Sequence, residues 1–183
     1  MIKREARILG LAAASRGLQQ IPVIGIVFRG NLWLDGILTC QIRPKEPDCM
    51  AELVGAILQS RQYSQIHAVI LPGEVLVSGV RFDISDFSHK IDLPVISIAR
   101  RALYRKGPSH RKPMPKSRTD YFGFKIAGRL VPVKVSGISR EETREIFDVA
   151  CVEGQQIPEA VRVAKMVATH VAGTPLSPIA SNA

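Results

Sequence analysis

The chain has 183 residues, enough for one domain with a substantial core, and 46% of them are hydrophobic, which excludes a chain that is disordered throughout. Its 25 Lys and Arg against 16 Asp and Glu give a net charge of +9, which favours an anionic partner such as nucleic acid, a membrane surface or an acidic protein over a soluble protein that is merely basic. The three cysteines form no CxxC pair, so we expect neither a disulfide scaffold nor a zinc site. Residues 1–7 are too charged for a signal peptide and no 18-residue apolar run occurs, so we expect a cytoplasmic protein without a membrane span.

The first elements that the sequence predicts are three strands. Residues 7–11 and 23–29 are apolar and rich in β-branched side chains. The Gly30-Asn31 turn signal separates the second strand from a third over residues 32–42, in which Gly36 marks a bulge. Short connections of this kind predict an antiparallel meander.

The middle of the chain alternates helices and strands. Residues 43–47 break the strand pattern, and Asp48 is placed to cap a helix whose apolar residues recur at helical spacing through Leu58. Pro72 and Gly73 end a buried strand that precedes a short helix and another buried strand. These last three elements are predicted over residues 66–71, 83–90 and 95–99.

Two helices are predicted near the C-terminus. Ser139 and Glu142 have the spacing of a capping box, and Gly154 is predicted to end the helix that they begin. Pro158 begins the last helix, whose inward-facing residues are predicted to be Val161, Ala164, Val167 and Ala168. We expect one domain over residues 1–172 and a flexible tail over residues 173–183.

The order of these elements predicts an α/β fold. An antiparallel meander followed by alternating strands and helices gives a mixed sheet flanked by helices. That pattern is compatible with a ribonuclease-H-like core, although it does not single out this fold.

Three blocks of sequence resemble an archaeal family known as endonuclease dU, whose members have unknown function and are related to endonuclease V. The first block is Val-Ile-Gly-Ile-Val-Phe-Arg-Gly at residues 23–30, followed by Leu-Asp-Gly-Ile-Leu at 34–38. The second covers residues 68–98, and the third joins Gly-Ile-Ser at 137–139 to the helix that contains residues 157–164. The resemblance implies a ribonuclease-H-like fold and a metal-dependent nuclease.

The chain departs from the family at the positions that imply catalysis. Where the family's first strand ends in two aspartates, this chain has Ala12 and Ala13, and where a later strand ends in Leu-Asp-Gly, it has Pro72. A third acidic turn falls near residues 43–45, which read Arg-Pro-Lys, and Lys165 stands where a histidine is usual. Mg²⁺ requires hard oxygen ligands, which alanine and proline side chains lack. We therefore expect no catalytic residues, no metal site and no cofactor.

Three remaining acids are the candidates for a rebuilt metal site. Glu74 lies two residues beyond the lost acid of its strand, a shift of roughly 6–7 Å. Asp35 is favoured as a turn residue and Asp83 as a helix cap.

A basic insertion over residues 100–118 is the main candidate for ligand binding. It contains eight Lys or Arg residues and no acid, and three prolines prevent a continuous helix. Its arginines can bind phosphates in a forked geometry, and its tyrosine and histidine can stack on unpaired bases. Tyr121, Phe122 and Phe124, which follow, are favoured as core or anchor residues. The candidate contact residues are Arg100, Arg101, Tyr104, Arg105, Lys106, His110, Arg111, Lys112, Lys116 and Arg118.

The leading hypothesis is a non-catalytic nucleic-acid-binding protein. RNA is favoured over DNA because a basic segment interrupted by prolines suits folded RNA and can become ordered on binding. Ribosomal RNA and ribosomal proteins are natural partners, and neither a membrane nor a small-molecule substrate is expected. The alternatives are a divergent metal-dependent endonuclease for damaged or deaminated nucleic acid and a module that binds an acidic protein.

Overall fold

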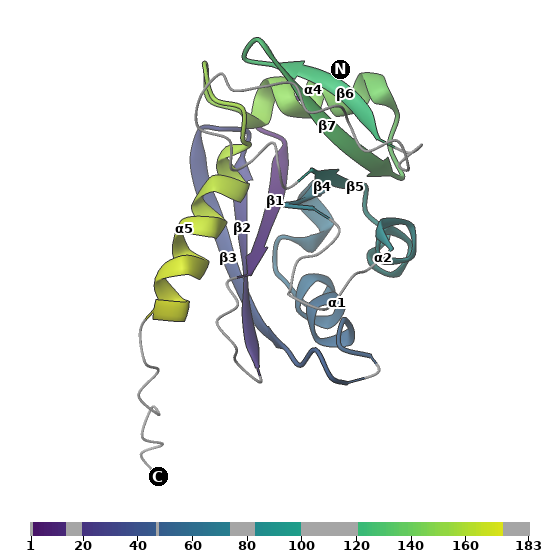
Figure 1. The fold of residues 1–183 in the computed structure, drawn as a ribbon, viewed down its shortest axis with the longest axis vertical. Coiled ribbons are helices and arrows are strands. Elements are labelled where there is room, and N and C mark those ends of the chain that lie inside the picture. The colour runs from purple at the N-terminus through teal and green to yellow at the C-terminus, as the bar shows by residue number, and fades with distance from the viewer. Residues whose placement is uncertain (1, 14–19, 47, 74–82, 100–120, 174–183) are drawn as a thin grey trace, which may run out of the picture.

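The computed structural model describes residues 2–13, 20–46, 48–73, 83–99 and 121–173. In these residues, a seven-stranded sheet of order β3-β2-β1-β4-β5-β7-β6 has helices on both faces (Figure 1). The predicted segment 100–118 lies outside the described residues, and so does the predicted tail apart from Gly173. Among the described helices, none has the length and apolar character needed to span a membrane.

The predicted antiparallel meander is confirmed. It consists of β1 (Arg7–Ala13), β2 (Ile21–Arg29) and β3 (Trp33–Ile42), each antiparallel to the next. The register shifts where Val27 faces Gly36 while Phe28 faces Leu34, so Asp35 is the extra residue of a bulge. The bulge predicted at Gly36 is therefore present, one residue earlier in the chain.

Two parallel strands extend the meander into a mixed sheet. β4 (Ile66–Leu71) pairs with β1, and β5 (Val95–Ile98) pairs with β4. The connections contain α1 (Ala51–Leu58), a short 3₁₀ turn at Tyr63–Gln65 and α2 (Ile84–Ile91).

The prediction that Asp48 caps α1 is wrong. Met50 is the N-cap residue, and no side chain caps this end of the helix. Asp48 instead accepts a hydrogen bond at its backbone carbonyl from the amide of Ala51 (3.0 Å). The turn preceding the helix is thus closed by backbone groups.

A hairpin that the sequence pattern did not predict extends the sheet beyond β5. β6 (Phe122–Ile126) and β7 (Arg129–Ser136) pair antiparallel, and β7 also pairs with β5. Ala127 and Gly128 form the two-residue turn with φ of 45° and 76°, the left-handed conformation that suits a tight hairpin.

The two predicted C-terminal helices are present. α4 (Arg140–Ala150) begins with the predicted capping box, but it ends four residues before Gly154 because Cys151 is already extended. Gly154 therefore does not end the helix and lies in the following turn with φ of 77°. α5 (Glu159–Gly173) follows Pro158 as predicted.

Alternating side chains of the sheet build a core on each face. Leu9 and Leu11 of β1 face α1 and α2, whereas Ile8 and Ala12 face α4 and α5. Of the residues predicted to point inward from α5, three are buried and Val167 is half-buried. Gly10 permits the close approach of α5, since a Cβ there would lie 2.7 Å from the carbonyl oxygen of Ala160.

Candidate nucleic-acid interface

The carboxyl ends of the three parallel strands lie side by side. Gly10 of β1 faces Ile70 of β4, which faces Ile96 of β5. Two residues further along each strand, this register brings Ala12, Pro72 and Ile98 to one edge, which we call the carboxyl edge. In α/β sheets this edge is the usual location of a binding site.

The described residues at the carboxyl edge provide no carboxylate at the strand ends. Ala12 is 2% exposed and packs against Ala160, Ala164 and Ala168 of α5. Pro72 is also buried. Across the described part of the chain, no group of three or more His, Cys, Asp or Glu side chains could hold a metal ion. The strand-end residues therefore do not fit the metal site that the family implies, and Glu74 lies outside the described residues.

The basic segment is joined to the sheet at this same edge. Ile98 of β5 and Phe122 of β6 both face Val133 of β7 from opposite sides. The amide of Ala99 donates to the carbonyl of Pro132 (2.9 Å), which fixes the last described residue before the segment. Because neighbouring strands lie about 4.8 Å apart, the backbone before and after residues 100–120 is held roughly 10 Å apart.

The aromatic residues that follow the basic segment anchor it to the core. Phe124 is 7% exposed and its ring lies 5.9 Å from that of Phe147 in α4. Phe122 is half-buried beneath the guanidinium of Arg140, which lies 3.7 Å from the ring centre. The anchor role predicted for these aromatic residues is confirmed for both.

Asp83 is a helix cap, as predicted. Its carboxylate accepts hydrogen bonds from the amides of Ser85 (2.6 Å) and Asp86 (3.4 Å) at the start of α2. The hydrogen bond from Ser85 contributes most to lowering the pKa of Asp83 below its usual value, and the charge of Lys134 lowers it further. Oδ1 of Asp83 thus accepts both hydrogen bonds from the helix terminus.

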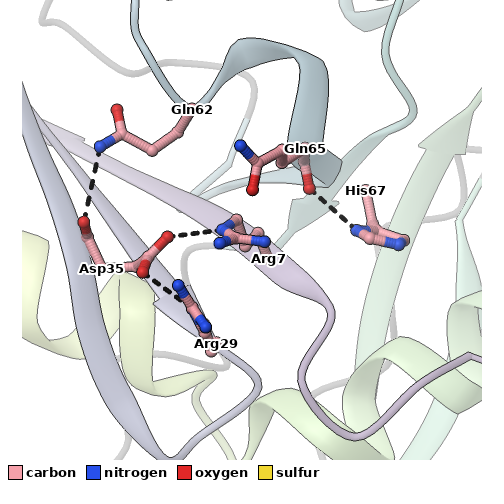
Figure 2. A network of polar contacts seen from close by, with 6 residues as sticks. All are labelled: Arg7, Arg29, Asp35, Gln62, Gln65 and His67. Atoms are coloured by element: carbon pink, nitrogen blue, oxygen red, sulfur yellow. Dashed lines mark hydrogen bonds and ion pairs between the residues drawn. The ribbon is translucent and has the colours of Figure 1, made fainter.

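Asp35 lies near the start of β1, away from the carboxyl edge, and belongs to no metal-binding cluster of the described residues. Figure 2 shows its carboxylate between Arg7 and Arg29. Its carboxylate accepts hydrogen bonds from Nε of Arg7 (2.5 Å) and from Nε of Arg29 (2.8 Å). The hydrogen bond from Arg7 contributes most to lowering the pKa of Asp35 below its usual range, and the bond from Arg29 and the two positive charges lower it further. Arg7 precedes Ala12 by five residues of one strand, a separation of about 17 Å. Asp35 therefore joins three strands at a bulge and is not the turn residue that the sequence favoured.

Residues 43–45, where the resemblance implies a third acid, carry basic side chains, and one of them forms ion pairs. Arg43 follows β3, and its guanidinium contacts the carboxylates of Glu46 (3.3 Å) and Glu52 (3.6 Å). Both glutamates are about half exposed, so these pairs add little to stability.

Sequence reasoning missed the contribution of β7 to this interface. Lys134 faces Ser97 across the sheet and lies close enough to Asp83 to affect its pKa. The signal available in the sequence was the alternation of residues 129–136 after a glycine turn, which the central Pro132 obscured.

A family model described as Endonuclease dU matches residues 4–172 of the chain. UPF0215 proteins of Methanothermobacter thermautotrophicus and Methanosarcina barkeri are each 29% identical to it, over 93% of this chain and 89% and 92% of theirs.

Solved structures share the fold at low sequence identity. A protein of unknown function from Archaeoglobus fulgidus aligns with a TM-score of 0.70 and 20% identity, over 90% of this chain and 97% of that one. Human ENDOV aligns with a TM-score of 0.62 and 15% identity, over 91% and 84%. Ciona intestinalis endonuclease V, in complex with a 24mer DNA, aligns with a TM-score of 0.62 and 10% identity, over 92% and 86%. These likenesses confirm the ribonuclease-H-like fold.

Proposed function

Since the chain belongs to the endonuclease dU family, we propose that it is a non-catalytic member that binds structured RNA through residues 100–118. The observation that carries the proposal is the carboxyl edge itself. There Ala12, Ala13 and Pro72 stand where the resemblance implies strand-end acids, and the backbone on both sides of the basic segment is fixed.

The replaced acids support the absence of catalysis. A two-metal nuclease positions cations with carboxylates so that they bridge the attacking and leaving oxygens. Ala12 is packed against α5, so this position also lacks the space in which a metal and a phosphate would meet.

The charge distribution supports a nucleic-acid ligand. Residues 100–118 contain eight of the 25 Lys and Arg residues, which leaves 17 against 16 acids in the rest of the chain. The basic segment thus supplies most of the net charge at one place, where contact with phosphates would release counterions. A fold neighbour, Ciona endonuclease V, binds a DNA that contains an inosine followed by a ribo-adenosine.

The proposal of RNA as the ligand rests on the composition of the segment. Basic chains interrupted by proline suit grooves and loops of folded RNA, where arginines meet phosphates and aromatic rings meet unpaired bases. Ribosomal RNA, with the ribosomal proteins around it, is the most abundant RNA of this kind that a cytoplasmic protein would encounter.

The salt dependence of RNA binding tests the role of the segment. We would replace Arg101, Arg105, Arg111 and Arg118 by Gln and measure affinity for a folded RNA across a salt series. Each lost phosphate contact lowers the slope of log K against log salt by nearly one, so the expected loss is roughly three to four. The matched control replaces four exposed basic residues elsewhere by Gln, and its slope should change by much less. These residues are Lys45, Arg61, Lys125 and Arg129.

Two further measurements separate this proposal from its alternatives. Sedimentation of native extracts at low salt should place the protein with large ribonucleoprotein particles, and ribonuclease should release it. Release by neither ribonuclease nor deoxyribonuclease would instead indicate an acidic protein partner. Cleavage of deaminated strands with Mg²⁺ or Mn²⁺ that disappears in Glu74→Gln would show the divergent endonuclease and overturn the proposal.

A further inference from the structure

β3 is a terminal strand of the sheet, and exposed apolar side chains lie along and beside it. β3 is the terminal strand of the sheet, so within the described residues no strand pairs with its outer edge. Eight large hydrophobic side chains of the described residues are exposed, and five of them lie on β3, in the turn before it or on α1. They are Leu32, Trp33, Leu34, Ile37 and Leu58.

This edge lacks the features that normally prevent strand addition. β3 has ten residues and contains neither Lys nor Pro, and the carboxylate of its single charged residue, Asp35, is engaged by Arg7 and Arg29. The opposite terminal strand, β6, has only five residues and carries Lys125. The side chain of Gln62 donates to the Asp35 carbonyl (3.5 Å), which leaves the stretch from Ile37 onward as the longer open edge.

An open groove runs between this edge and α1. It has a volume of about 640 Å³ and is lined on the strand side by Cys40, Gln41 and Arg43. The helix contributes small residues, Ala51, Gly55 and Ala56, together with Glu52 and Gln59. A Cβ placed on Gly55 would meet no atom within 4 Å, so the helix surface there is open.

The two ends of β3 carry opposite charge. At the Trp33 end, Arg7 and Arg29 outnumber Asp35 and leave a net +1. At the Ile42 end, residues 43–52 contain two basic and three acidic side chains and leave a net −1. Two copies of β3 related by a two-fold axis run antiparallel, so each positive end meets the negative end of the other copy.

We infer that the occupant of this edge is a second copy of the same chain, paired β3 to β3 in a two-fold dimer. The two sheets become continuous through backbone hydrogen bonds. The α1 helices lie on the same face on either side of the seam, where Ala51, Gly55 and Ala56 allow them to approach closely. The described residues that flank the basic segment belong to β5 and β6, and three strands separate β5 from β3 in the sheet. The inferred dimerisation therefore does not depend on the proposed RNA binding.

The test is the mass of the full chain in solution, measured by sedimentation equilibrium after nuclease treatment and at high salt. The wild type should have twice the 20.1 kDa of one chain at micromolar concentration. Gly55→Glu adds a side chain into open space on the isolated chain but places two carboxylates in the seam, so it should weaken the dimer roughly a hundredfold or more. Met166→Glu makes the same charge change at an exposed position of α5 and should remain dimeric.

Two controls keep the outcome interpretable. Circular dichroism and thermal unfolding report whether Gly55→Glu is folded, and Ile37→Lys adds a charge to the strand itself as a second variant. Trp33 is the chain's single tryptophan and is 47% exposed, so its emission should shift to the red as the wild type is diluted and dissociates. A wild type that stays at the mass of one chain, or a folded Gly55→Glu that dimerises like Met166→Glu, would overturn the inference.

Discussion

Ala12→Asp places a carboxylate where the resemblance to the family implies one at the end of the first strand, and we expect it to destabilise this chain. Ala12 is 2% exposed, and the cluster around it consists of apolar side chains of β2 and α5. A carboxylate placed there loses its hydration without gaining a ligand or a hydrogen-bond donor from that cluster. The family's acid therefore no longer fits at this position.

The expected loss in the free energy of unfolding has two parts. Enlarging a packed alanine site costs about 1–3 kcal/mol from overpacking alone. Leaving a buried charge uncompensated costs about 3–5 kcal/mol. Ala12→Asn has nearly the same shape without the charge, so the difference between the two variants isolates the electrostatic part.

Urea unfolding at several pH values, with and without millimolar Mg²⁺, measures both parts. Burial raises the pKa of the new carboxyl in the folded state, whereas the unfolded chain ionises at about 3.9. The extra loss in Ala12→Asp is therefore present at pH 7, shrinks as the pH falls through the raised folded pKa, and disappears only below the unfolded pKa of about 3.9, where both states become protonated. Equal stability of the two variants at pH 7, or stabilisation of Ala12→Asp by Mg²⁺ through mass action, would refute this reasoning.

Two further predictions concern the framework of the fold. Gly10→Ala should lower the melting temperature by about 4–10 °C, because its Cβ overlaps the backbone of α5; calorimetry that shows no decrease would contradict the packing described. Asp35→Asn should cost about 2 kcal/mol at pH 7 by weakening the bonds to Arg7 and Arg29. The pKa of Asp35 is lowered in the folded state, so this contribution is present above the unfolded pKa and is lost as the pH falls through the folded one; urea unfolding that shows a pH-independent loss would exclude the ion pairs as its cause.

Most of the core was predictable because its strands are buried on both faces. A short, continuous apolar run such as residues 68–71 is typical of a strand covered on both sides by helices, and Pro72 marks its end. The hairpin of β6 and β7 was not predictable from pattern alone. Pro132 lies within β7, and the turn uses Ala127 with φ of 45°, a residue type that does not indicate this conformation.

Helix ends were predicted only where side chains determine them. Ser139 and Glu142 form both hydrogen bonds of a capping box, so their spacing in the sequence was sufficient. At the start of α1, backbone hydrogen bonds replace a side-chain cap, and Asp48 was a misleading signal. Gly154 was misleading for a similar reason, because Cys151 leaves the helical conformation three residues earlier.

The charge of the candidate site could be read from the sequence. The position of the described residues around it could be known only from the pairing register of the strands. Eight basic residues in nineteen are visible in the sequence, but their relation to Ala12 and Pro72 depends on which residues face one another across four strands. The Arg7–Asp35–Arg29 cluster is similar, since three strands must pair in a particular register before these groups meet.

In the proposed function, the absence of acids at positions 12 and 72 and the basic composition of residues 100–118 act in the same direction. Without a bound cation, carboxylates at positions 12 and 72 would attract the segment's own arginines and repel an incoming phosphate backbone. Alanine and proline carry no charge and so have neither effect, and Ala12 also packs against α5. Under the proposed function, the positive charge of residues 100–118 would then serve an external polyanion. We therefore propose that the two features belong together and that a direct contact with phosphate stands in place of a metal-mediated one.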